Sequence, residues 1–196
     1  MVWSVDKSII QKHKSPVLFL QYRPITSLDK LICRATMSTH CHSALLFKHL
    51  DGKSLVHFDT HPSRGVSLQD FDDVASQYAG VIDVYHLEPH YSSCVDYNVL
   101  GEIALSFVGR RYGWFSISRV VAANTPFVWN TVKITVDDAA SNPKWMPTCS
   151  QLIAYAVRRA GLDLVPRTPD WMVVPGDLTK CLALRYDGCL SATEKS

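Results

Sequence analysis

The segment from Thr148 to Gly161 limits most strongly how this chain can fold, because both of its ends carry helix signals. Thr148 is a good N-cap, and Gln151 stands three residues later, where it completes a capping box with the threonine. Apolar residues recur at helical spacing between these ends, and Gly161 follows as a residue that ends helices in a left-handed conformation. The sequence therefore predicts an amphipathic helix that buries one face and begins next to Cys149.

Cys149 falls in the first turn of this helix. Unpaired backbone N–H groups and the positive end of the helix dipole favour a thiolate over a thiol there. The same N–H groups are placed to stabilise an oxyanion on a substrate. The alternative is a structural role, because most cysteines of intracellular proteins are small buried hydrophobic residues and this chain has six of them. A histidine elsewhere in the fold is needed to decide between the two.

Composition narrows the classes of protein to consider. A chain of 196 residues with 47% hydrophobic residues is long enough for one domain with a proper core. The formal net charge of +2 gives no reason to expect nucleic acid as a partner, and no stretch reaches the length of a membrane span. The six cysteines form no CxxC pair, and residues 1–14 contain no signal-peptide core. We therefore expect a protein made in the reducing cytoplasm, without a metal, a cofactor or a disulfide framework.

A hairpin is predicted in the first third of the chain. Residues 41–48 and 54–59 have strand character, and Asp51-Gly52 between them is a strong hairpin turn. Counting outward from that turn gives three facing pairs: Leu46 with His57, Ala44 with Asp59, and His42 with His61. Facing residues share a face, and alternate residues of a strand do too, so four polar side chains are expected on one side of the sheet: His42, His57, Asp59 and His61.

The rest of the chain alternates between short helices and strands. We expect helices at 6–13, 27–35, 91–108 and, in part, 68–78, strands at 17–22 and 81–87, and a turn or short helix at 175–178. Residues 1–14 are expected to be a lead-in, residues 15–190 one domain, and residues 191–196 a frayed tail. Within the domain, residues 119–147 are rich in proline and asparagine and are expected to form an irregular insertion or lid.

These residue types can supply a cysteine hydrolase, which needs a thiolate, an imidazole within hydrogen-bond reach and a group that fixes the imidazole. Cys149 is the candidate nucleophile and His42 the candidate base. For the third group we rank His57 ahead of Asp59, because a neutral imidazole can orient another imidazole without placing a charge in a partly buried strand. Asp59 would orient a charged imidazolium better and stays open as the alternative.

The main hypothesis from another class is a zinc site on the hairpin. His40 and His42 are two residues apart, so on a strand they would point the same way and share a zinc ion. Further potential ligands lie on the returning strand: His57, Asp59 and His61. A chain with eight histidines gives many accidental pairs of this kind, so we rank the zinc site below the cysteine hydrolase.

Four segments of the chain resemble sequence motifs of a known family. They are Thr39-His40-Cys41-His42-Ser43-Ala44-Leu45-Leu46-Phe47, then Leu55-Val56-His57-Phe58 with Arg64-Gly65-Val66, then Thr148-Cys149-Ser150-Gln151-Leu152 with Ala160-Gly161-Leu162, and Pro175-Gly176-Asp177-Leu178. Together they resemble the circularly permuted NlpC/P60 papain-like hydrolases, the YiiX/YaeF-like group. The likeness runs from about Ser15 to about Leu190, which is nearly the whole chain.

The resemblance implies an α+β, circularly permuted papain-like fold, in which a small antiparallel sheet packs on the Cys149 helix. By position, Cys149 matches the nucleophile and His42 the base. His57 matches the third polar residue, and a histidine there is similar to the more distant lecithin:retinol acyltransferase-like proteins. Two departures are Gln151, where glutamate is usual, and Ser43-Ala44 in place of Val-Gly.

The resemblance also implies an activity, which is hydrolysis of an amide or ester bond through a thioester intermediate. The first expected substrate is a peptidoglycan peptide, and the protein would then reach a bacterial envelope through a phage or a secretion apparatus. The first alternative is an acyltransferase or thioesterase that acts on lipids or lipoproteins. The second is a binding module that has kept the fold without catalysis.

Overall fold

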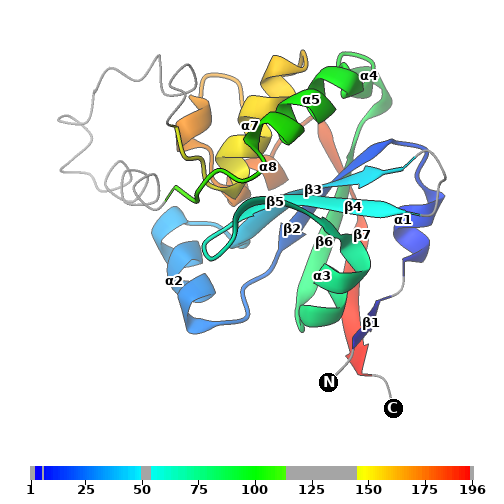
Figure 1. Cartoon of the computed structure of the whole chain (residues 1–196), viewed down its shortest axis with the longest axis vertical. Helices are drawn as coiled ribbons and strands as arrows, with labels where there is room; N and C mark the ends of the chain where they lie inside the picture. Colours follow the sequence, from blue (N-terminus) through cyan, green and yellow to red (C-terminus); the bar gives the residue numbers. More distant parts are fainter. Residues whose placement is uncertain (1–2, 6, 50–53, 114–144, 195–196) are drawn as a thin grey trace.

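The computed structural model describes residues 3–5, 7–49, 54–113 and 145–194, and its architecture is α+β (Figure 1). The strands are β1 (Trp3–Val5), β2 (Val17–Tyr22), β3 (His42–Lys48), β4 (Leu55–His61), β5 (Gly65–Asp70), β6 (Val81–Leu87) and β7 (Leu184–Glu194). They form one sheet in the order β1-β7-β6-β2-β3-β4-β5, and every neighbouring pair is antiparallel. The antiparallel sheet expected from the sequence is therefore present.

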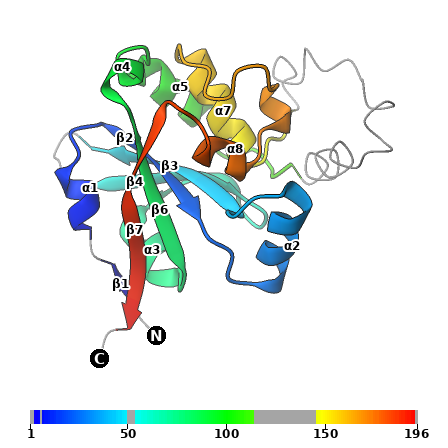
Figure 2. The same cartoon turned by 180° about the vertical axis from the view of Figure 1, so that it is seen from behind.

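Helices cover both faces of this sheet. They are α1 (Ser8–Lys12), α2 (Ser27–Thr36), α3 (Phe71–Gln77), α4 (Pro89–Ser92), α5 (Tyr97–Phe107), α7 (Cys149–Arg159) and α8 (Pro175–Thr179), with a 3-10 turn η1 (Asp170–Met172). Figures 1 and 2 show α4, α5, α7 and α8 on one face and α1 and α3 on the other, with α2 at one end. The sheet is thus the middle layer of three.

Strand β2 shows how the sequence produces this layering. Its residues are all buried, and alternate side chains enter two separate cores. Val17 and Phe19 belong to the core shared with α5 and α7, whereas Leu18 and Leu20 belong to the core shared with α1 and α3. An uninterrupted apolar run is what a strand buried on both faces requires, because successive side chains point to opposite sides.

Helix α7 forms where the sequence predicts it. It begins at Cys149 after the N-cap Thr148, and the capping box is present, with the Thr148 backbone N–H donating to Gln151 Oε1 at 3.0 Å. Gly161 follows the helix with φ +114°. A Cβ at that position would lie 2.4 Å from the backbone oxygen of Cys94, so this close approach also requires glycine.

Of the three facing pairs predicted for the hairpin, the Leu46–His57 pair is confirmed. In the β3–β4 ladder Leu46 faces His57, and the described pairs run from Leu45 with Phe58 to Lys48 with Leu55. The Asp51-Gly52 turn that fixes this register in the prediction lies outside the described residues. A one-residue slip would have moved the histidines to the other face, so the confirmed pair matters for the site.

One helix prediction needs correction. Residues 91–108 are not one helix, because the chain breaks between α4 and α5. Asp96 explains the break: its side chain accepts hydrogen bonds from the N–H groups of Asn98 and Val99, which caps α5, while its own N–H donates to the Ala160 oxygen. The prediction that residues 68–78 are helical in part is confirmed, since the end of β5 is followed by α3, whose N-cap is Asp70.

The two ends of the chain take part in the sheet, contrary to the expectation of a lead-in and a frayed tail. Strand β1 pairs with the end of β7, with Trp3 opposite Glu194 (Figures 1 and 2). Ile10 of α1 is fully buried. Most of the expected insertion at 119–147 lies outside the described residues, and within the described part Trp145 is buried against Phe107.

Candidate active site

The start of α7 meets the start of β3, and this places Cys149 beside His42. Cys149 is only 5% exposed, and its thiol hydrogen-bonds with the His42 imidazole. Backbone groups of Ser43 and Ser150 also hydrogen-bond to the sulfur. The nucleophile and the base predicted from the sequence are therefore in contact, although 107 positions separate them in the chain.

This contact changes the ionisation of both groups. Burial alone would raise the pKa of the Cys149 thiol, but the charge and hydrogen bond of His42 and the backbone hydrogen bonds of Ser43 and Ser150 lower it. Burial would lower the pKa of His42, but Cys149 and Asp59 overcome this and raise it to about 10. At neutral pH these shifts favour a thiolate–imidazolium pair, in which the sulfur is a nucleophile.

Asp59 fixes the other side of the His42 ring. His42 Nε2 lies 3.0 Å from Asp59 Oδ2, which leaves Nδ1 as the ring nitrogen for the sulfur. The carboxylate also accepts hydrogen bonds from Ser67 Oγ at 3.1 Å and from Arg64 Nη2 at 3.4 Å. Burial would raise the pKa of Asp59, but the hydrogen bond and charge of His42, with His57 and Arg64, hold it well below its usual range. Asp59 is therefore a buried anion that stabilises the imidazolium.

His57 does not hold His42, so the ranking of His57 over Asp59 is corrected. Its Nε2 lies 2.7 Å from the Tyr22 hydroxyl, and its ring stacks on Phe71 of α3. His57 is 1% exposed, and burial lowers its pKa to about 4, which keeps the ring neutral. The structure thus gives the two polar residues of β4 different partners, and Asp59 is the one next to the base.

The proposed pair of zinc ligands at the start of the hairpin separates. His40 Nε2 lies 2.7 Å from Asp83 Oδ2, and Asp83 is also held by Arg23 through two hydrogen bonds of 2.8 and 2.9 Å. His42 is bound to a different carboxylate, Asp59. His40 precedes β3, so the alternation of a strand does not apply to it. The two histidines therefore do not converge on one ion.

The first turn of α7 is tied to the segment that precedes α8. Ser150 Oγ donates to the Val173 oxygen at 2.7 Å, and the Gln151 side chain donates to the Trp171 oxygen. Both side chains are buried. These contacts fix the helix start, and with it Cys149, against η1 and the residues that lead into α8.

A cavity of about 450 Å³ adjoins the site. His42, Asp59 and Arg64 lie on its wall, together with Leu28 and Ile32 of α2. A smaller cavity of about 30 Å³ reaches Cys149. The two cavities share three lining residues: Ile32, Cys41 and Tyr112. A substrate in the larger cavity would therefore have a short path to the sulfur.

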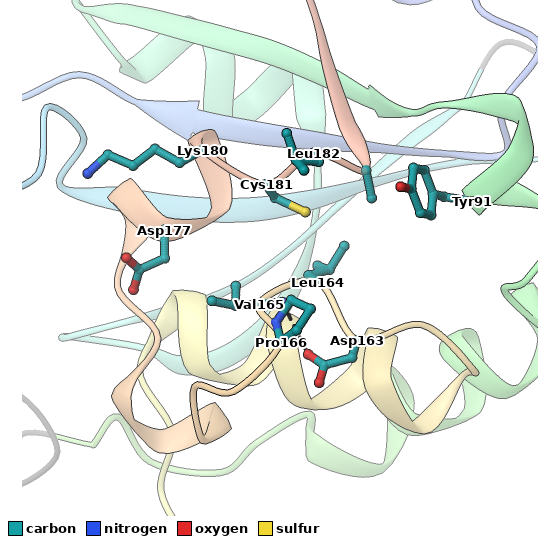
Figure 3. Close-up of a pocket in the computed structure, with 10 residues that line it drawn as sticks. Tyr91, Asp163, Leu164, Val165, Pro166, Asp177, Lys180, Cys181 and Leu182 are labelled. Carbon is teal, nitrogen blue, oxygen red and sulfur yellow. Dashed lines mark hydrogen bonds between the residues drawn. The ribbon is translucent and has the colours of Figure 1, made fainter.

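A third cavity, of about 340 Å³, lies between the segment after α7 and the segment after α8 (Figure 3). Cys181 lies in its wall, but no histidine does. Burial raises the pKa of the Cys181 thiol, which keeps its sulfur protonated at neutral pH. A cysteine without an imidazole is a poor nucleophile, so this cavity lacks the cysteine–histidine pair of the candidate active site.

Sequence reasoning missed the residues that hold the carboxylate. Ser67 faces Asp59 across the β4–β5 ladder, and Arg64 comes from the turn between these strands. The signal was present in the alternation of residues 65–70, where the sequence was interpreted as a turn at 64–66 followed by a partly helical segment at 68–78. A strand there would have placed a hydroxyl beside Asp59 and made it the better third member.

A scan of the chain against family models finds no match, and a search of curated proteins finds none either. The resemblance to permuted NlpC/P60 hydrolases therefore rests on the residues of this chain alone and stays a prediction. Among the described residues, none of the helices combines the length and the apolar character that crossing a bilayer requires.

Proposed function

We propose that this chain is a cysteine hydrolase of the circularly permuted papain-like type, which cleaves an amide or ester bond. The observation that carries the proposal is the continuous contact of a helix-start sulfur, an imidazole and a buried carboxylate: Cys149, His42 and Asp59. Such a set of three groups is defined by geometry and not by order along the chain. The proposal replaces His57 by Asp59 as the third member.

In the proposed reaction the Cys149 thiolate attacks the carbonyl carbon of the substrate. The oxyanion forms near the backbone N–H groups at the start of α7, and the His42 imidazolium gives its proton to the leaving amine or alcohol. The resulting thioester is then attacked by water, whose proton passes to His42. Release of the carboxylic acid regenerates the thiolate–imidazolium pair. Asp59 stays ionised throughout and stabilises the imidazolium.

The first substrate class is a peptide amide such as that of peptidoglycan, which the resemblance supports. A second class, acyl lipids or acylated proteins, is favoured by the apolar residues of α2. Leu28 and Ile32 line the larger cavity, and Leu31 and Met37 beside them are 61% and 75% exposed. An acyl chain would cover this apolar surface, whereas a peptidoglycan peptide would leave it in water.

The first experiment needs no knowledge of the substrate. The intact chain is treated with limiting iodoacetamide at pH 6, and the alkylated cysteines are identified by peptide mapping. Ordinary thiols are less than about 1% ionised at this pH, so a lowered pKa gives Cys149 the advantage over better exposed cysteines. We expect Cys149 to react before the exposed Cys94 and Cys189. Alkylation of those two with Cys149 unmodified would contradict the proposal.

The second experiment separates the substrates. Muropeptides and acyl thioesters are incubated with the wild type, with Cys149→Ala and with Cys181→Ala as the matched control. Turnover of one class should fall by at least about 1000-fold in Cys149→Ala and stay unchanged in Cys181→Ala. Turnover that survives in Cys149→Ala would reject the hydrolase. Binding of either class that is unaffected by both changes, without turnover, would favour the binding module.

A further inference from the structure

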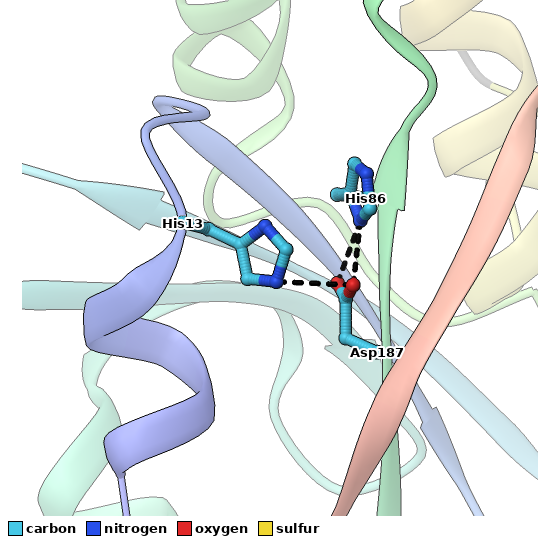
Figure 4. A group of neighbouring side chains, drawn as sticks. All are labelled: His13, His86 and Asp187. Carbon is cyan, nitrogen blue, oxygen red and sulfur yellow. Dashed lines mark hydrogen bonds and ion pairs between the residues drawn. The ribbon is translucent and has the colours of Figure 1, made fainter.

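Three potential metal ligands converge where the end of α1 meets the β6–β7 pair (Figure 4). His13 Nε2 lies 3.0 Å from Asp187 Oδ1, and His86 Nδ1 lies 2.8 Å from both oxygens of the same carboxylate. The ligand atoms of the three residues all lie within 4.8 Å of one another. Among the described residues, these are the histidine, cysteine or acidic side chains that lie close enough together, in a group of three, to share one ion.

The backbone of β7 explains why Asp187 reaches the histidines. The pairing of β6 with β7 shifts between Val84 and Tyr85, so Gly188 faces Val84 and Tyr186 faces Tyr85. Asp187 is the extra residue between them, and the irregularity is a β-bulge, with Gly188 at φ +141°. Bulges commonly redirect a side chain. This one turns the carboxylate toward His86 on the neighbouring strand.

We propose that His13, His86 and Asp187 form a binding site for a divalent transition metal ion, with Zn²⁺ as the ion to test. Two neutral imidazoles and a carboxylate are ordinary zinc ligands, with bonds of about 2.0–2.2 Å that place ligand atoms about 3.3 Å apart in a tetrahedron. The spacings of 2.8 and 3.0 Å need only a small expansion to fit. Water can take the fourth position, because the His13 and His86 side chains are 22% and 17% exposed.

The charges around the group permit a cation. Asp187 carries the negative charge, and the neighbouring positive group is Lys48, whose ammonium is held by the backbone oxygens of Ile10 and His13. Burial lowers the pKa of His13, and this favours the neutral imidazole that a metal needs. The ion would take the place of the protons that the two rings now direct at the carboxylate.

This site is distinct from the candidate active site. On β2, Tyr22 faces His42, and Phe19, three residues away, faces Tyr85, the neighbour of His86. The two groups are therefore about 10 Å apart along the strands. They are also separated across the sheet, because β3 and β6 lie on opposite sides of β2. The ion would join the end of α1 to the β6–β7 pair. Its role would be to fasten the N-terminal segment to the sheet, and it does not depend on the proposed hydrolase activity.

The test measures metal binding directly by the intact chain. Isothermal titration with Zn²⁺ after treatment with a chelator should give one ion per chain, and Co²⁺ should give the visible spectrum of a tetrahedral site without a thiolate charge-transfer band. Zn²⁺ at about 100 times its Kd should raise Tm by about 5 to 10 °C. No binding with a Kd below about 100 μM would overturn the proposal.

Variants locate the ion. Asp187→Asn and His13→Gln should each weaken binding by at least about 100-fold, whereas the exposed His90→Ala and the active-site Cys149→Ala should not change it. His13→Gln lies on a partly exposed residue after α1, so it tests the site even if Asp187→Asn unfolds. Binding retained in both ligand variants, or lost only in Cys149→Ala, would overturn the proposal.

Discussion

The same sheet carries two aspartates that each hold histidine, and the two groups are built differently. At the active-site corner, Asp59 is 4% exposed and serves one imidazole, His42, whose other nitrogen faces a sulfur. At the β6–β7 bulge, Asp187 serves two imidazoles, His13 and His86, and all three side chains are partly open to solvent. The first is a chain of contacts, and the second is a cluster around a centre.

The difference determines what each group can do. In the chain of contacts at the active site, a buried anion polarises one ring, which in turn faces the sulfur. The pKa of that ring, His42, is raised to about 10. In the cluster, two rings compete for one carboxylate, and burial lowers the pKa of His13. A raised imidazole pKa suits a partner of a thiolate, whereas a neutral imidazole suits a metal ion. The same residue types therefore support nucleophilic chemistry in one place and ion binding in the other.

The largest expected effect is that of Asp59→Asn on the rate at which Cys149 is alkylated. In the wild type the lowered Cys149 pKa and the His42 pKa of about 10 predict faster alkylation at pH 6 than for an ordinary thiol, with a weaker rise between pH 6 and 9. Loss of the carboxylate should remove the imidazolium and return the thiol toward an ordinary pKa. Alkylation at pH 6 should then fall by at least about 10-fold and rise more steeply with pH, as measured by stopped-flow or mass spectrometry.

The matched control is Asp187→Asn, which changes the other carboxylate in the same way. It should leave the rate and the pH profile of Cys149 alkylation unchanged, since Asp187 has no contact with His42 or Cys149 among its described partners. An equal loss in both variants would mean that the carboxylates act only through folding. A pH profile of Asp59→Asn equal to that of the wild type would return His57 to consideration as the orienting group.

A smaller effect is expected from His57 on stability in acid. Its pKa of about 4 in the fold lies below the unfolded value of 6.5, so between these pH values the unfolded chain binds a proton that the folded chain does not. Stability should fall by about 2 to 3 kcal/mol as pH drops from 7 to 4.5, with no such loss above pH 6.5. Urea unfolding of His57→Gln should show a weaker pH dependence by that amount.

The exposed His90 provides the control for this measurement, because His90→Gln should leave the acid dependence of the wild type in place. If His57→Gln keeps the full acid dependence, then other buried groups cause it. If the same variant also loses Cys149 reactivity at pH 6, then His57 does more than pack against Tyr22 and Phe71.

Comparison of prediction and structure shows which inferences the sequence supports. The α7 helix and the Leu46–His57 pair were predictable because each rests on local chemistry, a capping box in one case and a hairpin turn in the other. The sequence showed that Cys149 and His42 are residue types that could act as nucleophile and base, but it did not show that they are in contact. That contact depends on how α7 packs on the sheet, which no local signal fixes.

The error over the third residue came from giving the cost of a buried charge more weight than distance. In the predicted register Asp59 is two residues from the position that faces His42 and His57 is four residues from it, so distance favoured Asp59. We ranked His57 first because a lone carboxylate in a buried strand is costly. That cost is met by hydrogen bonds from Ser67 and Arg64, on a strand that was not predicted. The bulge at Asp187 was equally hidden, because it depends on a pairing between distant strands.

The smallest effect is expected at the cluster itself, and it tests whether the cluster matters for the fold in the absence of metal. Asp187→Asn, measured by urea unfolding in a chelator, should lose about 1 to 2 kcal/mol, because it removes the charge from hydrogen bonds to two partly exposed rings. His13→Gln should lose less, since only one of these bonds is removed. With Zn²⁺ added, the gap between the wild type and both variants should widen, because only the wild type gains from the ion. A gap that zinc does not change would leave these three residues as a hydrogen-bonded clamp between α1 and the sheet.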